Sequence, residues 1–248
     1  MMKKKLTFIL IVFAFSLASS QEMKKEHQDV IKTFIDCIEN RNIEKLKTFI
    51  AFPFKRRYPL PHIKDETDFM KRYDKIFDDK LTQTITKSDL NKDWSAVGWR
   101  GIMLNRGALW IDYDGRLLSL NLSDTEQTIR EKIIEADKNS IHNSLGEFEQ
   151  PILLAETKKF RVRIDVLSNG KYRYASWSIN AEMNEKPDLI IENGKQILNG
   201  YRGENISYEF INGDYKYECI FNNRGDRELC VYKNGNKILT QPFLIVNH

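Results

Sequence analysis

The hydrophobic period changes along this chain, from that of helices before about residue 80 to that of strands after it. Residues 22–40 place apolar side chains at steps of three and four, from Val30 to Ile38, and predict an amphipathic helix. Stretches with the same period follow at 43–51 and 65–80, separated by prolines. Helices followed by strands predict an α+β domain, in which the helices cover one face of a curved antiparallel sheet.

The strands of this first domain are expected near 82–88, 95–104, 107–112 and 116–121. Ser123 and Glu126 then have the spacing of a capping box, which predicts a third helix over 124–138. The polar stretch 139–150 reads as a linker. The sequence therefore predicts an α+β domain at 21–122, followed by a connecting helix and linker at 123–150.

From residue 151 to 248 the pattern is nearly all strand and turn, and predicts an antiparallel β domain. Phe160, Val162, Ile164 and Val166 alternate with Arg161, Arg163 and Asp165, as in a half-buried strand. Asn-Gly pairs begin at Asn169, Asn193, Asn212 and Asn234, and this dipeptide accepts the positive φ angles of two-residue hairpin loops. We expect a meander, a small sandwich or an open barrel.

The chain has three cysteines. A turn centred on Arg224-Gly225 would place Cys219 opposite Cys230, and an oxidising compartment would allow them to form a disulfide. The alternative is two buried thiols. Cys37 falls on the apolar stripe of the first helix, where we expect a buried free thiol.

The first twenty residues have the organisation of a cleavable export signal. Lys3, Lys4 and Lys5 precede an uncharged, mostly apolar run at 6–17, and Ala18-Ser19-Ser20 supplies the small residues that a signal peptidase needs. The run is short for a membrane span, which takes about 20 residues; an N-terminal anchor is the alternative. We expect cleavage after Ser20 and a secreted or periplasmic protein with no stable membrane anchor.

Charge and motifs argue against several classes of function. Removal of residues 1–20, which carry three lysines and no acid, lowers the formal net charge from +4 to +1. The remaining charges are interspersed and Lys55-Arg56-Arg57 reads as a solvated turn, so we do not expect a nucleic-acid partner. The histidines and cysteines lack metal-ligand spacing, and the phosphate and dinucleotide loops are absent. We expect no metal and no cofactor.

Four stretches carry a resemblance to a known family: Phe52-Pro53-Phe54, residues 69–77, residues 98–103 and residues 107–111. Together with the order of elements over 22–122, they resemble the nuclear-transport-factor-2-like superfamily, a cone-shaped α+β fold. Some members are isomerases, cyclases or dehydratases with an Asp/His pair in the cone, and others are binding modules. No such pair maps onto this sequence. The C-terminal half is similar in architecture to small periplasmic β-barrel inhibitors of cell-wall hydrolases.

Candidate ligand-binding residues are aromatic and basic. Trp99, Arg100 and Trp110, with Trp94, could wall a pocket for an anionic or sugar-like ligand, and the alternative is that the tryptophans are core residues. In the second domain Arg173 and Trp177 share one face of a strand, and Tyr172 and Tyr174 share the other. One face must be core, and the other could be an exposed binding surface.

Asp74 is the candidate catalytic residue, a general base if it points into the cone; otherwise it is a solvated helix residue. With this one candidate and no nucleophile or cofactor motif, we favour a secreted protein without enzymatic activity that binds a protein, a glycan or a small molecule. A pocket enzyme of isomerase or hydrolase type, using a cone carboxylate, is one alternative. An inhibitor of a cell-wall hydrolase is the other.

Overall fold

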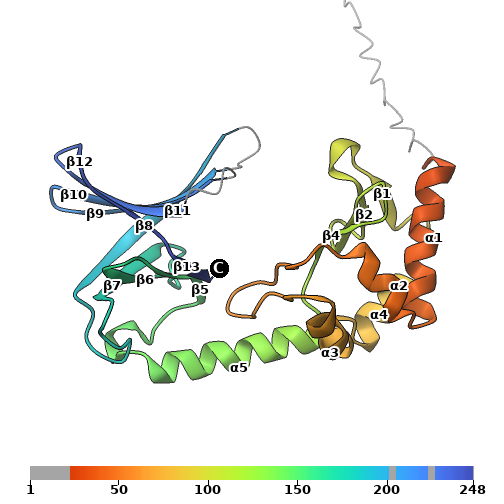
Figure 1. Ribbon diagram of the computed structural model, residues 1–248, viewed down its shortest axis with the longest axis horizontal. Helices are drawn as coiled ribbons and strands as arrows, with labels where there is room; N and C mark the ends of the chain where they lie inside the picture. The colour runs from red at the N-terminus through yellow and green to blue at the C-terminus, as the bar shows by residue number, and fades with distance from the viewer. Residues whose placement is uncertain (1–22, 201–204, 223–226, 248) are drawn as a thin grey trace, which may run out of the picture.

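The computed structural model describes residues 23–200, 205–222 and 227–247, and the expected export signal at 1–20 lies outside them. Helices and strands form two lobes joined by the long helix α5 (Figure 1). The α+β lobe holds α1 (Lys25–Glu39), α2 (Ile43–Leu46), η1 (Lys47–Phe49), α3 (Glu66–Ile76), α4 (Asp79–Thr86), β1 (Trp94–Ala96), η2 (Gly98–Arg100), β2 (Ile102–Leu104), β3 (Leu109–Ile111) and β4 (Leu117–Leu120). After α5 (Asp124–Ser140) and η3 (Asn143–Leu145), the β lobe holds β5 (Gln150–Glu156), β6 (Phe160–Val166), β7 (Tyr172–Ser178), β8 (Leu189–Asn199), β9 (Asn205–Asn212), β10 (Tyr215–Phe221), β11 (Arg227–Lys233), β12 (Asn236–Pro242) and β13 (Ile245–Asn247).

The helices of the α+β lobe bury the faces that the sequence predicts. α1 buries Ile31, Phe34, Cys37 and Ile38, so the expected buried thiol of Cys37 is confirmed. The cap of α3 is Asp65, whose carboxylate accepts the Asp68 N–H at 2.9 Å. These helices pack on a four-stranded antiparallel sheet of order β1-β2-β3-β4. An α+β arrangement with a curled sheet is therefore confirmed.

The strand predicted near 82–88 is wrong, because these residues lie mostly in α4. Thr84, Ile85 and Thr86 are β-branched and suggested a strand. The Asp78 side chain overrides that preference: it accepts the Leu81 N–H at 3.0 Å and caps the helix. Ile85 is then fully buried where α4 packs against α1.

The β lobe is a nine-stranded antiparallel sheet of order β12-β11-β10-β9-β8-β7-β6-β5-β13. The long strand β8 belongs to both halves of it: residues 189–194 pair with β7, and residues 195–199 pair with β9. The two halves close over a shared hydrophobic core that includes Tyr174, Phe210 and Leu229. β13 completes the half that contains β7 by pairing with β5. The expected all-antiparallel β region is confirmed.

Of the Asn-Gly pairs named above, those that begin at Asn169, Asn212 and Asn234 lie at hairpin connections, and the pair that begins at Asn193 does not. Asn234-Gly235 forms a two-residue loop between Lys233 and Asn236, with φ angles of 49° and 79°. Asn193-Gly194 instead lies within β8, at a register shift, with Asn193 at a φ of 63°. A Cβ on Gly194 would lie 2.2 Å from the Phe210 ring. The glycine is needed here for close packing rather than for a hairpin turn.

The predicted disulfide is wrong: Cys219 and Cys230 are both free and buried. The cause is a register that differs by one residue, since Cys219 pairs with Leu229 and Cys230 with Glu218. A shift of one residue turns a side chain to the other face of the sheet. The Cys219 side chain therefore lies in the core, while the Cys230 thiol contacts Glu228 and Thr240 on the outer face. The expected turn at Arg224-Gly225 lies outside the described residues.

The N-terminal end of α5 is fixed to the α+β lobe by a buried ion pair. Ser123 accepts the Glu126 N–H at 3.0 Å, as the capping box predicts, but the Glu126 carboxylate is turned away to Arg56. The Arg56 Nε donates to Glu126 at 3.0 Å, and its Nη1 donates to the Leu120 carbonyl at 2.7 Å. The prediction that Arg56 belongs to a solvated turn is wrong, because its side chain is 1% exposed.

The C-terminal end of α5 is fixed to the β lobe in the same way. Asp137 accepts two hydrogen bonds from the Arg163 guanidinium, at 3.0 and 2.7 Å. Arg163 Nε also donates to Asp165 at 2.8 Å, and Arg173 donates to the other Asp165 oxygen at 2.8 Å. The strand β6 is therefore buried on both faces, and not half-buried as predicted, because helix α5 and its ion pairs cover the charged face. Burial opposes the charge of Arg163, but Asp165 and Asp137 raise its pKa.

The segment that follows η1 packs beside α5, as Figure 1 shows for the loop reaching toward the β lobe. Arg130 of α5 donates to the Tyr58 carbonyl at 2.8 Å and to Gln150 at 2.7 Å. Burial raises the pKa of the Tyr58 hydroxyl to about 12, with Arg163 opposing that shift. The peptide bonds Phe52-Pro53 and Tyr58-Pro59 are cis. This loop therefore contacts both the helix and the start of the β lobe.

Replacing Arg56 by Ala tests the fixation of α5. Glu126, whose side chain is 2% exposed, would keep only Arg72 at 3.8 Å. Leaving one partner of a buried pair alone costs about 3–5 kcal/mol, and we expect a loss of that size in urea unfolding followed by circular dichroism. Arg57→Ala is the matched control, because the neighbouring Arg57 is exposed, and its loss should be about 0.5 kcal/mol or less. Equal losses in the two variants would contradict the assignment.

The free cysteines can be counted directly. Thiol titration of the unreduced, denatured protein should find all three thiols, since no described pair is bonded. In the native state the reaction should be slow, because each thiol is buried and burial raises the pKa of Cys219. Only one reactive thiol in the denatured sample would show that Cys219 and Cys230 are joined. A sample reduced beforehand provides the reference count.

Candidate functional site

The interior of the α+β lobe is filled by side chains. Leu104, Leu109 and Ile111 of the sheet are fully buried and belong to one cluster with Phe34 and Phe69 of the helices. Along each strand the side chains point alternately to the two faces of the sheet, and those on the inner face pack on the helices. The cone interior that the resemblance implied as a pocket is thus occupied by the core.

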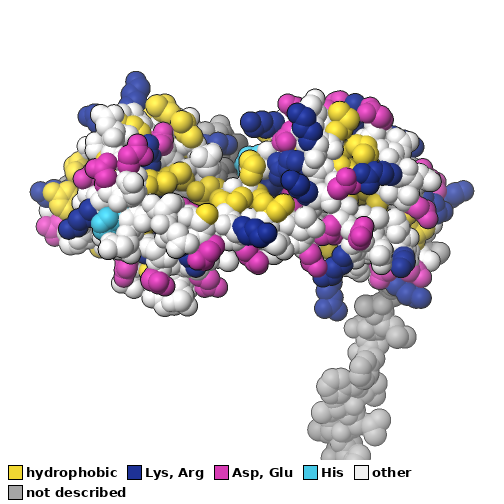
Figure 2. Space-filling view, turned by 90° about the horizontal axis from the view of Figure 1, so that it is seen from below, with side chains coloured by type: hydrophobic (Ala, Val, Ile, Leu, Met, Phe, Trp, Pro, Cys, Tyr) yellow, Lys and Arg dark blue, Asp and Glu magenta, His cyan; other side chains and the backbone are white. Residues whose placement is uncertain are grey.

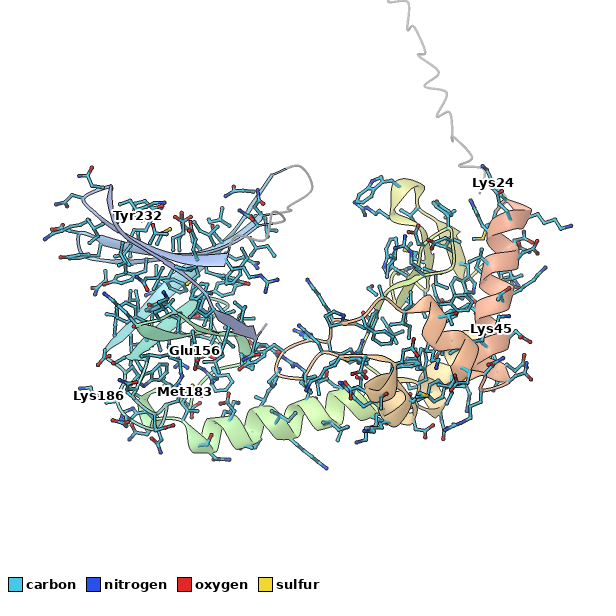
Figure 3. All side chains as sticks on the ribbon, in the orientation of Figure 1. Lys24, Lys45, Glu156, Met183, Lys186 and Tyr232 are labelled. Carbon is cyan, nitrogen blue, oxygen red and sulfur yellow. The ribbon has the colours of Figure 1, made fainter. Side chains whose placement is uncertain are left out.

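A hollow lies at one end of this lobe, between the start of α1 and the edge strand β1. It measures about 930 Å³, and we call it the α1–β1 hollow. Lys24 marks this end of α1 in Figure 3. Its lining residues come from the start of α1, the α4–β1 connection, β1, η2 and the β3–β4 connection. They are Met23, Lys24, His27, Leu90, Asn91, Lys92, Trp94, Ser95, Ala96, Gly98 and Tyr113.

One wall is a pair of aromatic rings in contact, tilted relative to one another. The His27 and Tyr113 ring centroids are 4.3 Å apart with an interplanar angle of 33°. The Tyr113 hydroxyl donates to the Gly98 carbonyl at 2.6 Å and fixes the turn at η2 beside it. The buried His27 Nδ1 has no hydrogen-bond partner within the described part of the chain. The contact between α1 and the β3–β4 connection thus buries the His27 Nδ1 atom beside the Tyr113 ring.

Another lining residue is Trp94, the first residue of β1. Its side chain is buried, and its indole N–H donates to the Ser88 hydroxyl at 2.8 Å. Trp94 faces inward opposite Leu104, whereas Ser95 and Ala96 are exposed. β1 is the edge strand of its sheet. The hollow is therefore bounded by a rigid aromatic ring and an accessible strand edge.

The charged residues that line the hollow are the lysines Lys24 and Lys92. The Lys24 ammonium is 3.6 Å from Glu26, and the Lys92 ammonium is 3.4 Å from Asp89, neither of which lines the hollow. Both lysines are more than 70% exposed, at 72% and 79% of their side chains. Such surface pairs are weak, at about 0–1 kcal/mol. The lysines are thus able to exchange these partners for a bound anion.

The predicted pocket residues Trp99, Arg100 and Trp110 do not meet in one site. Trp99 is 63% exposed on η2, and the Arg100 guanidinium lies 5.7 Å from its ring centroid. Trp110 pairs with Met103 and Ser119 on the face of the sheet turned away from the core. Trp94 alone of the four tryptophans considered lines the α1–β1 hollow, which borders η2 through Gly98.

Arg173 and Trp177 share a strand face, as predicted, and that face is interior. Arg173 is 2% exposed and Trp177 is 1% exposed. Besides Asp165, Arg173 donates to the carbonyls of Leu145 and Glu147 in the segment that covers β7. Trp177 packs there with Ile141 and Leu145. The other face, with Tyr174, is also core, so neither face of β7 is an exposed binding surface.

Asp74 lies outside the core of the α+β lobe. Its side chain is 69% exposed and forms an ion pair with Arg41 at 2.5 Å. The Arg41 guanidinium also lies over the Tyr73 ring, 5.1 Å from its centroid. A general base in a pocket is desolvated, and Asp74 has the surroundings of a surface ion pair.

Sequence reasoning missed His27 and Tyr113. His27 is one of four histidines in the sequence, and Tyr113 lies between the strands expected at 107–112 and 116–121. Their contact joins residues 86 positions apart, and a single sequence offers no signal for such a pairing. Within the described residues, no group of three or more His, Cys, Asp and Glu side chains is arranged to hold a metal ion. Among those same residues, no helix combines the length and the apolar character of a membrane span.

Comparison of this chain with protein-family models, with curated proteins and with solved structures finds no match.

Proposed function

We propose that this protein is an exported, non-enzymatic binding protein whose ligand site is the α1–β1 hollow. The observation that carries the proposal is the hollow itself, about 930 Å³, walled by aromatic rings and lysines. Sites for small molecules usually measure about 300–1,000 Å³ and combine apolar walls with a few polar groups. The ligand class that this favours is a small molecule rather than a polymer.

Binding without chemistry is supported by how the polar groups of the hollow are used. Catalysis requires a base within hydrogen-bond reach of the group that it activates. His27 and Tyr113 instead contact one another through their rings, and the Tyr113 hydroxyl is engaged by the Gly98 carbonyl. Asp74 lies on α3, in an ion pair with Arg41, and does not line this hollow.

Export is the second part of the proposal and is supported by the composition of residues 1–20. Every residue that lines the hollow follows this segment, so its removal would leave the site intact. We propose further that the α+β lobe is related to the nuclear-transport-factor-2-like superfamily. The order of helices before a curled sheet supports this, with the ligand at the end of the sheet instead of inside it.

A ligand of the hollow should stabilise the protein. In a thermal-shift screen of small organic compounds, a true ligand at about 100 times its Kd adds about 2.7 kcal/mol and raises Tm by about 5–10 °C. Ala96→Trp should abolish that shift, because Ala96 is exposed on β1 and lines the hollow, so the indole would fill it. Ser119→Trp, at an exposed position on the far strand of the sheet, should keep the shift. Hits that survive Ala96→Trp would place binding elsewhere.

The export proposal predicts the N-terminus of the protein recovered from its natural host. Mass spectrometry of the intact chain should find Gln21 first and a mass lower by residues 1–20, in the extracytoplasmic fraction. A chain that begins at Met1 or Met2 in the cytosolic fraction would refute export.

A further inference from the structure

The α1–β1 hollow has charged walls of one sign. Its lining residues include Lys24 and Lys92 and no Asp or Glu. Resting on the function proposed above, we infer that the ligand is a small organic anion with an apolar or aromatic body. The positive groups would bind its charged end, and the rings of the walls its apolar end.

The end of helix α1 adds to the positive potential. α1 has 15 residues, and the side chain of its N-cap residue Lys24 makes no capping hydrogen bond. The first N–H groups of a helix carry a partial positive charge when no side chain caps them. Lys24 at the N-cap and His27 in the first turn line the hollow, whereas Glu26 of the same turn does not. The lysine ammonium groups and the helix end therefore act on the same space.

The body of the ligand is defined by the other walls. Leu90 and Met23 are partly exposed and present apolar surface, Trp94 is buried, and the His27 and Tyr113 rings form an aromatic side. A simple inorganic anion would leave these rings without a partner.

Charge in the hollow can be separated from apolar contact with two fluorescent probes of similar size. 8-Anilinonaphthalene-1-sulfonate carries one negative charge, and N-phenyl-1-naphthylamine carries none. Both are titrated into the purified protein that begins at Gln21, and the Kd of each is measured at low and at physiological ionic strength. We expect the sulfonate to bind more tightly than the neutral probe, and its affinity to fall with salt.

Two lysine pairs provide the matched variants. In Lys24→Gln/Lys92→Gln the Kd of the sulfonate should rise about twofold to thirtyfold, because each exposed charge contact is worth about 0.2–1 kcal/mol. The Kd of the neutral probe should stay unchanged. Lys45→Gln/Lys186→Gln removes the same charge from exposed lysines outside the hollow, both labelled in Figure 3, and should leave both Kd values unchanged.

The outcomes separate this inference from the function on which it rests. If the sulfonate binds the Lys24/Lys92 variant as tightly as the parent, or if the control pair weakens it equally, the anion inference is overturned while binding in the hollow stands. If Ala96→Trp leaves both probes bound with unchanged Kd, the hollow is not their site and the proposed function is contradicted as well. Loss of both probes in Ala96→Trp with selective loss of the sulfonate in Lys24→Gln/Lys92→Gln supports both.

Discussion

The arrangement of this molecule depends on charged pairs buried at the two ends of α5. At one end Glu126 meets Arg56 of the α+β lobe, and at the other Asp137 meets Arg163 of the β lobe. Buried charges are costly unless they are paired and hydrogen-bonded. An unpaired guanidinium or carboxylate would result if either lobe moved away from the helix. The pairs thus fix the position of α5 against each lobe. Their hydrogen bonds are directional, which apolar packing is not.

The same principle explains why the β lobe tolerates arginines in its interior. Asp165 accepts hydrogen bonds from Arg163 and Arg173. Arg173 also donates to the carbonyls of Leu145 and Glu147. The Arg163 guanidinium also lies over the Phe148 ring, 4.7 Å from its centroid. Charge of both signs is otherwise dispersed over the surface, as the face in Figure 2 shows. The concentrated polar groups are inside, where they join the helix to the sheet.

The sequence allowed the classes of structure to be predicted because they are encoded locally. Apolar spacing located α1, Ser123 located the start of α5, and Asn234-Gly235 located a hairpin. The predictions were wrong where contacts between residues distant in sequence determine burial or pairing. Arg56 looked solvated because its partner is 70 residues away, and the alternation in β6 gave no sign that α5 would cover its charged face. The predicted pairing of Cys219 was wrong by one residue, because the alternation of side chains along a strand does not determine which residue lies opposite on the next strand. The α1–β1 hollow depends on contacts between segments far apart, so of its lining residues only Trp94 was a candidate for ligand binding.

The position of β13 has a consequence for the order in which the β lobe is built. Its residues 245–247 pair with β5, which is made about ninety residues earlier, and Leu244 donates to the Glu156 carbonyl at 2.7 Å just before it. During synthesis β5 therefore waits with an open hydrogen-bonding edge, and open edges invite pairing with other chains. A chain that lacked residues 245–247 would leave this edge of β5 unpaired. The edge of β5 is therefore paired late in synthesis, and we expect the β lobe to be most prone to self-association before β13 emerges.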